Sequence, residues 1–177
     1  MRGMMVLGTM LLSIPASAQT ASPAASPPAC TAPEFAQFDF WVGEWDVYPT
    51  GGDKLVAHSR IEKLYNGCAI RENWMPLNGN DGGSLNTYVA GAKEWRQLWT
   101  DSSASWAEFR GAFDGKAMVL TGTGFAANGA LTRMTYRRNP DGSVRQLGEN
   151  SSDKGATWTP SFDFTYRPAK KGRAGSE

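Results

Sequence analysis

The chain has 177 residues, with 18 Lys and Arg against 17 Asp and Glu, so its formal net charge is +1. This length corresponds to one domain of ordinary size. A protein that binds nucleic acid needs a basic excess on one face to neutralise phosphates, and the balanced charge excludes that class of partner.

The first residues have the features of a secretory signal peptide. Arg2 supplies a positive start, residues 6–14 form a short apolar run, and Ala16-Ser17-Ala18 is a small-residue cleavage pattern. The apolar run is shorter than the about 20 residues that a membrane-spanning helix needs. We therefore expect residues 1–18 to be removed and the mature protein to be periplasmic or secreted, with no membrane attachment after cleavage.

Composition divides the remaining chain into three parts. Residues 19–34, mostly Ala, Ser, Pro and Thr, predict a flexible tether, residues 35–168 a β-barrel domain, and residues 169–177 a disordered basic tail. An even number of cysteines in an exported chain predicts a disulfide between Cys30 and Cys68. The alternative is that both are free, with Cys68 buried as a small hydrophobic residue.

Turn signals recur at hairpin spacing from residue 41 onward, and helix signals are nearly absent. Asn-Gly and Asp-Gly pairs such as Asn66-Gly67 and Asp114-Gly115 are the strongest short cue for a hairpin. We expect about ten antiparallel strands, which can either stack or close, and closure removes edges that invite aggregation. The sequence thus predicts an all-β fold, one antiparallel barrel with little helix. The expected strands are 41–48, 54–65, 68–75, 84–89, 94–100, 106–113, 117–122, 130–138, 143–150 and 157–167.

Alternation within the strands indicates which side chains face the interior. In the last expected strand, Trp158, Phe162, Phe164 and Tyr166 are predicted to share one buried face. Other apolar faces are broken by polar groups, which predicts a lumen with room for more than packed side chains.

Glu72 is the most informative of these interruptions, because it lies between two apolar residues of the same face. A buried carboxylate without a partner is costly, so Glu72 implies water, a ligand, or a basic partner such as Arg60 or Arg133. Gln97 interrupts another strand in the same way. The predicted ligand-binding residues are Arg60, Glu72, Trp74, Gln97, Trp99, Arg133 and Tyr136.

Several blocks of the chain resemble an exported bacterial family of unknown function. They are FDFWVGEWDV at 38–47, Ile61-Glu62-Lys63 before Gly67-Cys68, Arg71-Glu72-Asn73-Trp74, Trp95-Arg96-Gln97-Leu98-Trp99 and Asp101-Ser102-Ser103. The resemblance covers roughly residues 38–166. It implies a calycin-like barrel of about eight to ten strands, similar to lipocalins and haem-binding nitrobindins, and it implies no established activity.

The Gly43-x-Trp45 element is shared with lipocalins, in which the Trp closes one barrel end against an Arg of a late strand. We interpret Trp41 and Trp45 as such an end plug rather than as ligand-binding residues. The candidates for the stacking arginine are Arg133, Arg137 and Arg167.

The residues give little support to metal or triad chemistry. His58 is the single histidine, it does not correspond to the haem ligand of nitrobindins, and no ligand cluster accompanies it, so we expect no metal and no cofactor. No Ser lies in Gly-x-Ser-x-Gly. Two carboxylates remain as candidates for catalysis: Glu72, kept protonated by burial, and Asp101, ionised at the end of a strand.

We expect the lumen to bind a small, largely apolar molecule, because apolar walls with a few convergent polar groups typify binding pockets. The loops at residues 78–83 and 101–103 are natural rims for it, and the alternative for the first loop is that it is only a long hairpin connection. The alternatives are a cofactor-free isomerase, cyclase or lyase that uses Glu72, and a structural or protein-interaction module. The sequence does not indicate an oligomeric state.

Overall fold

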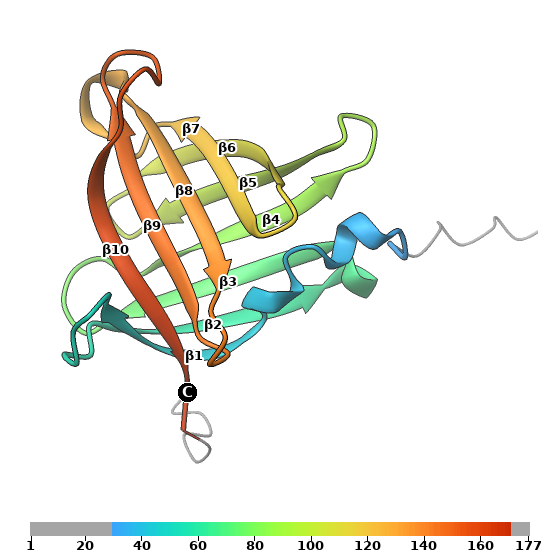
Figure 1. Ribbon diagram of the computed structural model, residues 1–177, viewed down its shortest axis with the longest axis horizontal. Helices are drawn as coiled ribbons and strands as arrows, with labels where there is room; N and C mark the ends of the chain where they lie inside the picture. The colour runs from blue at the N-terminus through green and yellow to red at the C-terminus, as the bar shows by residue number, and fades with distance from the viewer. Residues whose placement is uncertain (1–29, 171–177) are drawn as a thin grey trace, which may run out of the picture.

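Turns rich in Gly, Asn and Asp separate ten strands, which close into an antiparallel barrel (Figure 1). The computed structural model describes residues 30–170. Each strand pairs with its sequence neighbours, and β1 pairs with β10 to close the barrel. The strands are β1 Gly43–Pro49, β2 Ala57–Leu64, β3 Ala69–Pro76, β4 Gly82–Val89, β5 Glu94–Asp101, β6 Trp106–Phe113, β7 Ala117–Thr123, β8 Leu131–Arg138, β9 Val144–Ser151 and β10 Thr159–Pro168.

The predicted all-β barrel is confirmed, and each of the ten expected strands overlaps an observed one. Helix is limited to short 3-10 turns: η1 Pro33–Ala36, η2 Asp39–Trp41, η3 Tyr65–Gly67 and η4 Ala127–Gly129. The first of these begins inside the segment predicted as a tether. The predicted signal peptide and all but two residues of the predicted basic tail lie outside the described residues.

The segment that precedes β1 plugs one end of the barrel. Phe38 and Trp41 are fully buried there and stack with their ring centroids 4.9 Å apart. The Trp45 indole Nε1 donates a hydrogen bond of 2.9 Å to the Trp41 carbonyl oxygen, which fixes the plug to the first strand. Figure 1 shows this segment, in blue, across the end at which the β8–β9 hairpin turns. The interpretation of Trp41 and Trp45 as an end plug is confirmed.

The prediction that an arginine of a late strand stacks on the Trp45 indole is wrong. The arginine–aromatic stacks of the described chain place Arg133 over Trp158, at 4.2 Å from the ring centroid, and Arg167 over Tyr48, at 4.3 Å. Both arginines extend from the outer face of the barrel, because their strand neighbours occupy the inner face.

A disulfide joins Cys30 to Cys68, as predicted, with the two Cα atoms 5.0 Å apart. It ties Cys30, three residues before the start of η1, to Cys68, the residue after η3, and so fastens the plug segment to the turn between β2 and β3. Such a bond is compatible with an exported protein. Within residues 30–170, no helix is long and apolar enough to cross a membrane.

The buried face of β10 is shorter than the alternation predicted. Phe162, Phe164 and Tyr166 point inward and join the core, whereas Trp158 lies before the strand and under the Arg133 guanidinium on the outside. The register of β10 against β9 shifts between Pro160 and Phe162, and this irregularity moves the residues before it out of phase. The prediction that Trp158 shares the buried face is therefore wrong.

Candidate functional site

The barrel interior has three layers along its axis. At one end lies the aromatic plug, built around Phe38 and Trp41. Polar side chains from seven strands meet in the middle, and at the other end aromatic side chains surround a cavity. This order follows from strand alternation, because each strand contributes two or three inward side chains at successive heights.

The polar layer begins at Glu72, whose side chain is 4% exposed. Ser59 Oγ on β2 donates to Glu72 Oε1, and Ser84 Oγ on β4 donates to Glu72 Oε2, each over 3.2 Å. Asn86 Nδ2 donates to Ser84 Oγ over 3.0 Å, and Gln97 Nε2 on β5 donates to Asn86 Oδ1 over 2.7 Å. Hydrogen bonds thus run from β5 across β4 to the carboxylate on β3.

A second arm returns to Glu72 from the opposite wall. Gln97 Nε2 and Gln146 Nε2 both donate to Tyr136 Oη, over 3.3 and 3.0 Å. Tyr166 Oη donates to Gln146 Oε1 over 2.6 Å and lies 3.3 Å from Glu72 Oε1. The two arms together form a closed ring, which we call the polar ring: Glu72, Ser84, Asn86, Gln97, Tyr136, Gln146 and Tyr166.

Burial raises the pKa of Glu72 to about 7, although the hydroxyl donors around it favour the charged form. The prediction that a basic residue, Arg60 or Arg133, pairs with Glu72 is wrong. Arg60 points outward, with its Nε 4.0 Å from Glu44 Oε1, and the Arg133 guanidinium is 2.8 Å from Glu149. Both arginines alternate with inward-facing residues on their strands. Among the described residues, the side chains within hydrogen-bonding distance of the Glu72 carboxylate are the neutral hydroxyl groups of Ser59, Ser84 and Tyr166.

A cavity of about 210 Å³ lies beside the polar ring, on the side away from the plug. Its walls are mainly aromatic, and its polar surface comes from three members of the ring. Phe162 and Phe164 stack at 5.3 Å between centroids, and Trp74 packs against Phe164 at 5.9 Å. The lining residues are Glu72, Trp74, Trp99, Phe125, Met134, Gln146, Phe162, Phe164 and Tyr166.

Phe125 is a cavity residue that the sequence did not reveal. It lies in the connection after β7, is 42% exposed, and packs at 6.2 Å from Trp99 and 6.1 Å from Phe162 between ring centroids. Strand alternation cannot assign a loop residue to a face. The available signal was a lone large aromatic residue in a connection of small and polar residues.

The predicted ligand-binding residues divide into three groups. Glu72, Trp74 and Trp99 line the cavity, and Gln97 and Tyr136 belong to the polar ring. Arg60 and Arg133 lie on the outer surface and away from the cavity. Residues of the cavity that the prediction did not include are Phe125, Met134, Gln146, Phe162, Phe164 and Tyr166.

Asp101, the second candidate for catalysis, lies at the end of β5. Its Oδ1 accepts hydrogen bonds from Ser103 N and Oγ, and its Oδ2 accepts one from Trp99 Nε1, so the pKa of this carboxyl is lowered, with the Ser103 bond as the largest cause. Ser102 N donates to the Asp81 carbonyl over 2.8 Å, which places the two predicted rim loops side by side.

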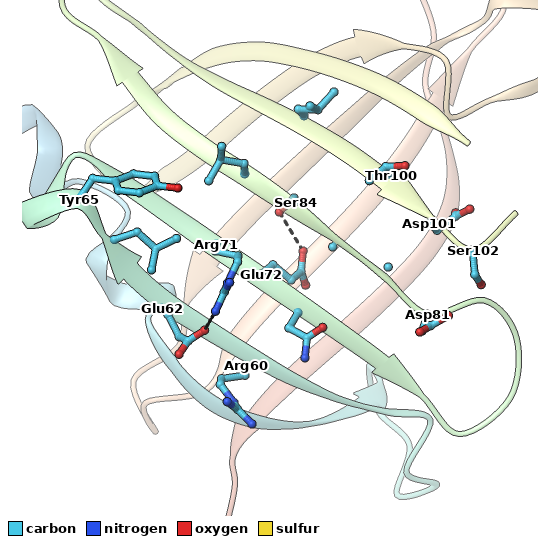
Figure 2. Close-up of a pocket in the computed structure, with 16 residues that line it drawn as sticks. Arg60, Glu62, Tyr65, Arg71, Glu72, Asp81, Ser84, Thr100, Asp101 and Ser102 are labelled. Atoms are coloured by element: carbon cyan, nitrogen blue, oxygen red, sulfur yellow. Dashed lines mark hydrogen bonds and ion pairs between the residues drawn. The ribbon is translucent and has the colours of Figure 1, made fainter. Parts of the chain in front are cut away.

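These loops border a shallow groove of about 720 Å³ on the outer face of β2–β5. Figure 2 shows Asp81, Asp101 and Ser102 on one side of it and the Glu62–Arg71 ion pair toward the other, with Glu72 and Ser84 between them. Asp101 accepts its hydrogen bonds from Trp99, Ser103 and Ser105, all within residues 99–105, and none of these bonds reaches Glu72. The structure therefore does not bring the two carboxylates together as a hydrogen-bonded pair.

His58 lies on the barrel wall, with its Nδ1 2.7 Å from Asp46 Oδ1. Among the described residues, no group of three or more His, Cys, Asp or Glu side chains is arranged to hold a metal ion.

The site and fold define an antiparallel barrel with an internal cavity, an architecture consistent with the calycin-like class. No protein-family model matches the chain, and no curated protein sequence matches it. The resemblance to an exported family is therefore an expectation that comes from the sequence motifs, and the evidence for the barrel comes from the structure.

Proposed function

We propose that this protein binds a small, largely apolar molecule in its lumen. The observation that carries the proposal is the cavity of about 210 Å³ with aromatic walls and a polar floor. Apolar walls with a few placed polar groups are the usual composition of a ligand pocket.

The size and lining of the cavity favour a ligand with one ring or a short branched chain. An apolar protein cavity of about 150 Å³ binds benzene, and this cavity is somewhat larger. Trp74, Trp99, Phe162 and Phe164 offer ring faces to such a ligand. Glu72 and Tyr166 at the floor would orient one polar group.

A ligand would enter the cavity past the side chain of Phe125. The plug occupies the opposite end of the barrel, whereas Phe125 lines the cavity and is 42% exposed. A single aromatic side chain at the end of a loop can change rotamer without disturbing the strands below it. Opening would therefore require no rearrangement of the barrel.

Tryptophan fluorescence tests the proposal directly, because Trp74 and Trp99 line the cavity. Titration with toluene or 2-phenylethanol should change the emission and raise the melting temperature by mass action. The Trp99→Phe variant should lose part of the emission change. The matched Trp106→Phe variant should keep it, because Trp106 is 59% exposed on β6.

Native mass spectrometry of protein from its own host should also detect a bound small molecule. An unoccupied protein that shows no emission change and no thermal shift with these probes would refute binding in the lumen.

A second candidate function is a cofactor-free lumen enzyme that uses Glu72 as acid and base. The specific observation in its favour is that the pKa of Glu72 is raised to about 7, where a carboxyl can both donate and accept a proton. Replacing Glu72 with Gln would then abolish turnover while leaving ligand affinity nearly intact. Equal loss of turnover and binding would argue against a catalytic role.

A further inference from the structure

We infer that the lumen selects small amines, whose ammonium group pairs with the Glu72 carboxylate while the apolar body lies among the aromatic walls. This inference rests on the proposed binding function and names its ligand class. It is carried by the direction of the hydrogen bonds around Glu72, the charge of the cavity lining and the chemistry of the walls.

Hydrogen bonds in one arm of the polar ring point toward Glu72. Both protons of the Gln97 amide group go to Asn86 Oδ1 and Tyr136 Oη, and those of the Asn86 amide group go to Ile70 O and Ser84 Oγ. Ser84 therefore directs its single proton to Glu72 Oε2. A carboxylate accepts hydrogen bonds and donates none, so this arm ends at an acceptor.

The other arm leaves Glu72 Oε1 short of donors. Tyr166 has one hydroxyl proton, and its contact with Gln146 Oε1 is 2.6 Å, against 3.3 Å to Glu72 Oε1. The Gln146 amide nitrogen donates to Tyr136 Oη, so its carbonyl oxygen is the acceptor for Tyr166. Ser59 is the remaining donor to Oε1, over 3.2 Å. A ligand that supplies a donor would complete the coordination of this oxygen.

The charge of the lining favours a cation as that donor. The nine described residues that line the cavity include one carboxylate and no Lys, Arg or His. An ionised Glu72 in this surrounding would repel carboxylates and phosphates, and a buried charge is stable only with a partner. An ammonium group would be that partner.

The aromatic walls favour the same chemistry. Ammonium groups are attracted to the faces of Trp, Tyr and Phe rings, and most strongly to Trp. Trp74 packs 6.4 Å from Tyr166 between ring centroids, so an indole borders the floor that carries Glu72. The same side chains would shield the apolar body of the ligand from water.

The inference predicts a specific dependence on pH. The titratable group that faces Glu72 from β10 is Tyr166, and Tyr136 faces it across the ring from β8, while β2 and β4 contribute the neutral Ser59 and Ser84. Burial raises the pKa of both tyrosines, so they stay neutral below pH 10. The ionisation of Glu72 therefore controls the affinity for an ammonium group.

The experiment compares four probes of similar shape by calorimetry: 2-phenylethylamine, 2-phenylethanol, propylbenzene and phenylacetate. An alkylammonium keeps its proton up to about pH 10, so the amine is charged throughout. At pH 8.5 the amine should bind at least about tenfold more tightly than the alcohol, and its affinity should fall about tenfold at pH 6 as Glu72 takes up a proton. Affinity for the alcohol and the hydrocarbon should change little with pH.

The variant Glu72→Gln should bind the amine and the alcohol equally and lose the pH dependence. Glu44→Gln, which removes a carboxylate that is exposed on β1, is the matched control and should behave as wild type. Should Glu72→Gln fail to fold, the comparison of probes on wild-type protein still decides the question.

Two outcomes would overturn the inference while the proposed function stands: equal affinity for the alcohol and the amine at pH 8.5, or tighter binding of phenylacetate. If none of the four probes binds at either pH, both the ligand class and the lumen-binding function are refuted.

Discussion

Replacing Glu72 with Gln should remove a cost to stability that grows with pH. Glu72 is buried among neutral donors, and its pKa is raised from 4.5 to about 7. Between these two values the folded protein binds more protons than the unfolded chain, so its stability falls as the pH rises. Glutamine mimics the neutral acid at every pH and carries no such cost.

The magnitude follows from the size of the pKa change. At about 1.4 kcal/mol for each pH unit, a rise from 4.5 to about 7 corresponds to about 3 kcal/mol. The favourable contribution of the neutral acid is complete below about pH 4.5 and is lost as the pH passes through 7. Wild type should therefore lose about 3 kcal/mol relative to Glu72→Gln between pH 4.5 and pH 8.5.

Urea unfolding followed by circular dichroism, with the disulfide oxidised, measures this difference at each pH. Glu44→Gln provides the control, because its carboxylate is exposed and its curve should run parallel to that of wild type. A difference between wild type and Glu72→Gln that stays constant within about 0.5 kcal/mol over the whole range would refute the reasoning. It would mean that Glu72 ionises in the folded barrel without penalty.

Three further changes test other parts of the barrel. Reducing the Cys30–Cys68 bond opens a loop whose ends are 38 residues apart in the sequence, and it should lower the free energy of unfolding by about 4 kcal/mol by the chain-entropy relation. The urea midpoint should fall accordingly, and an unchanged midpoint would contradict this prediction. Trp41→Ala empties the centre of the plug and should cost about 3–5 kcal/mol, and a loss below about 1 kcal/mol would show that the plug is dispensable. In Gly148→Ala the new Cβ would meet the Phe162 ring, so stability should fall by about 1–3 kcal/mol and lumen binding should weaken, whereas unchanged probe affinity would contradict this account.

The strands could be predicted because their signals are local. Asn-Gly and Asp-Gly turns mark most boundaries, and β6, at Trp106–Phe113, has the predicted bounds. Alternation then placed Glu72 and Gln97 on the inner face and gave both as binding candidates. These inferences need only the period of a strand and the preference of Gly for positive φ, which no distant residue alters.

Partners across the barrel could not be predicted in the same way. The sequence neighbours of Arg60 do not show which residues lie near its side chain in the barrel. Its positive charge alone suggests it as a partner for Glu72. Its position between the inward-facing Ser59 and Ile61 places it outside. The hydroxyl of Tyr166 meets Glu72 only because β10 closes the barrel beside β1. Such contacts depend on closure and register, which a single strand does not specify.

Irregular segments were the other source of error. The register shift before Phe162 turned Trp158 to the outside, and the connection after β7 brought Phe125 over the cavity. A bulge changes the phase of alternation without an obvious residue signature, and a loop has no phase at all.

The polar ring is the part of the barrel that packing alone does not explain. Its amide and hydroxyl groups satisfy one another through hydrogen bonds and would be complete with a neutral side chain at position 72. Glu72 instead adds a carboxylate whose ionised form has no cation beside it in the described interior. A residue that lowers stability where a neutral one would suffice is expected at a functional site. The amine hypothesis assigns that cost to ligand recognition, because an ammonium group would supply both the missing donor and the missing charge.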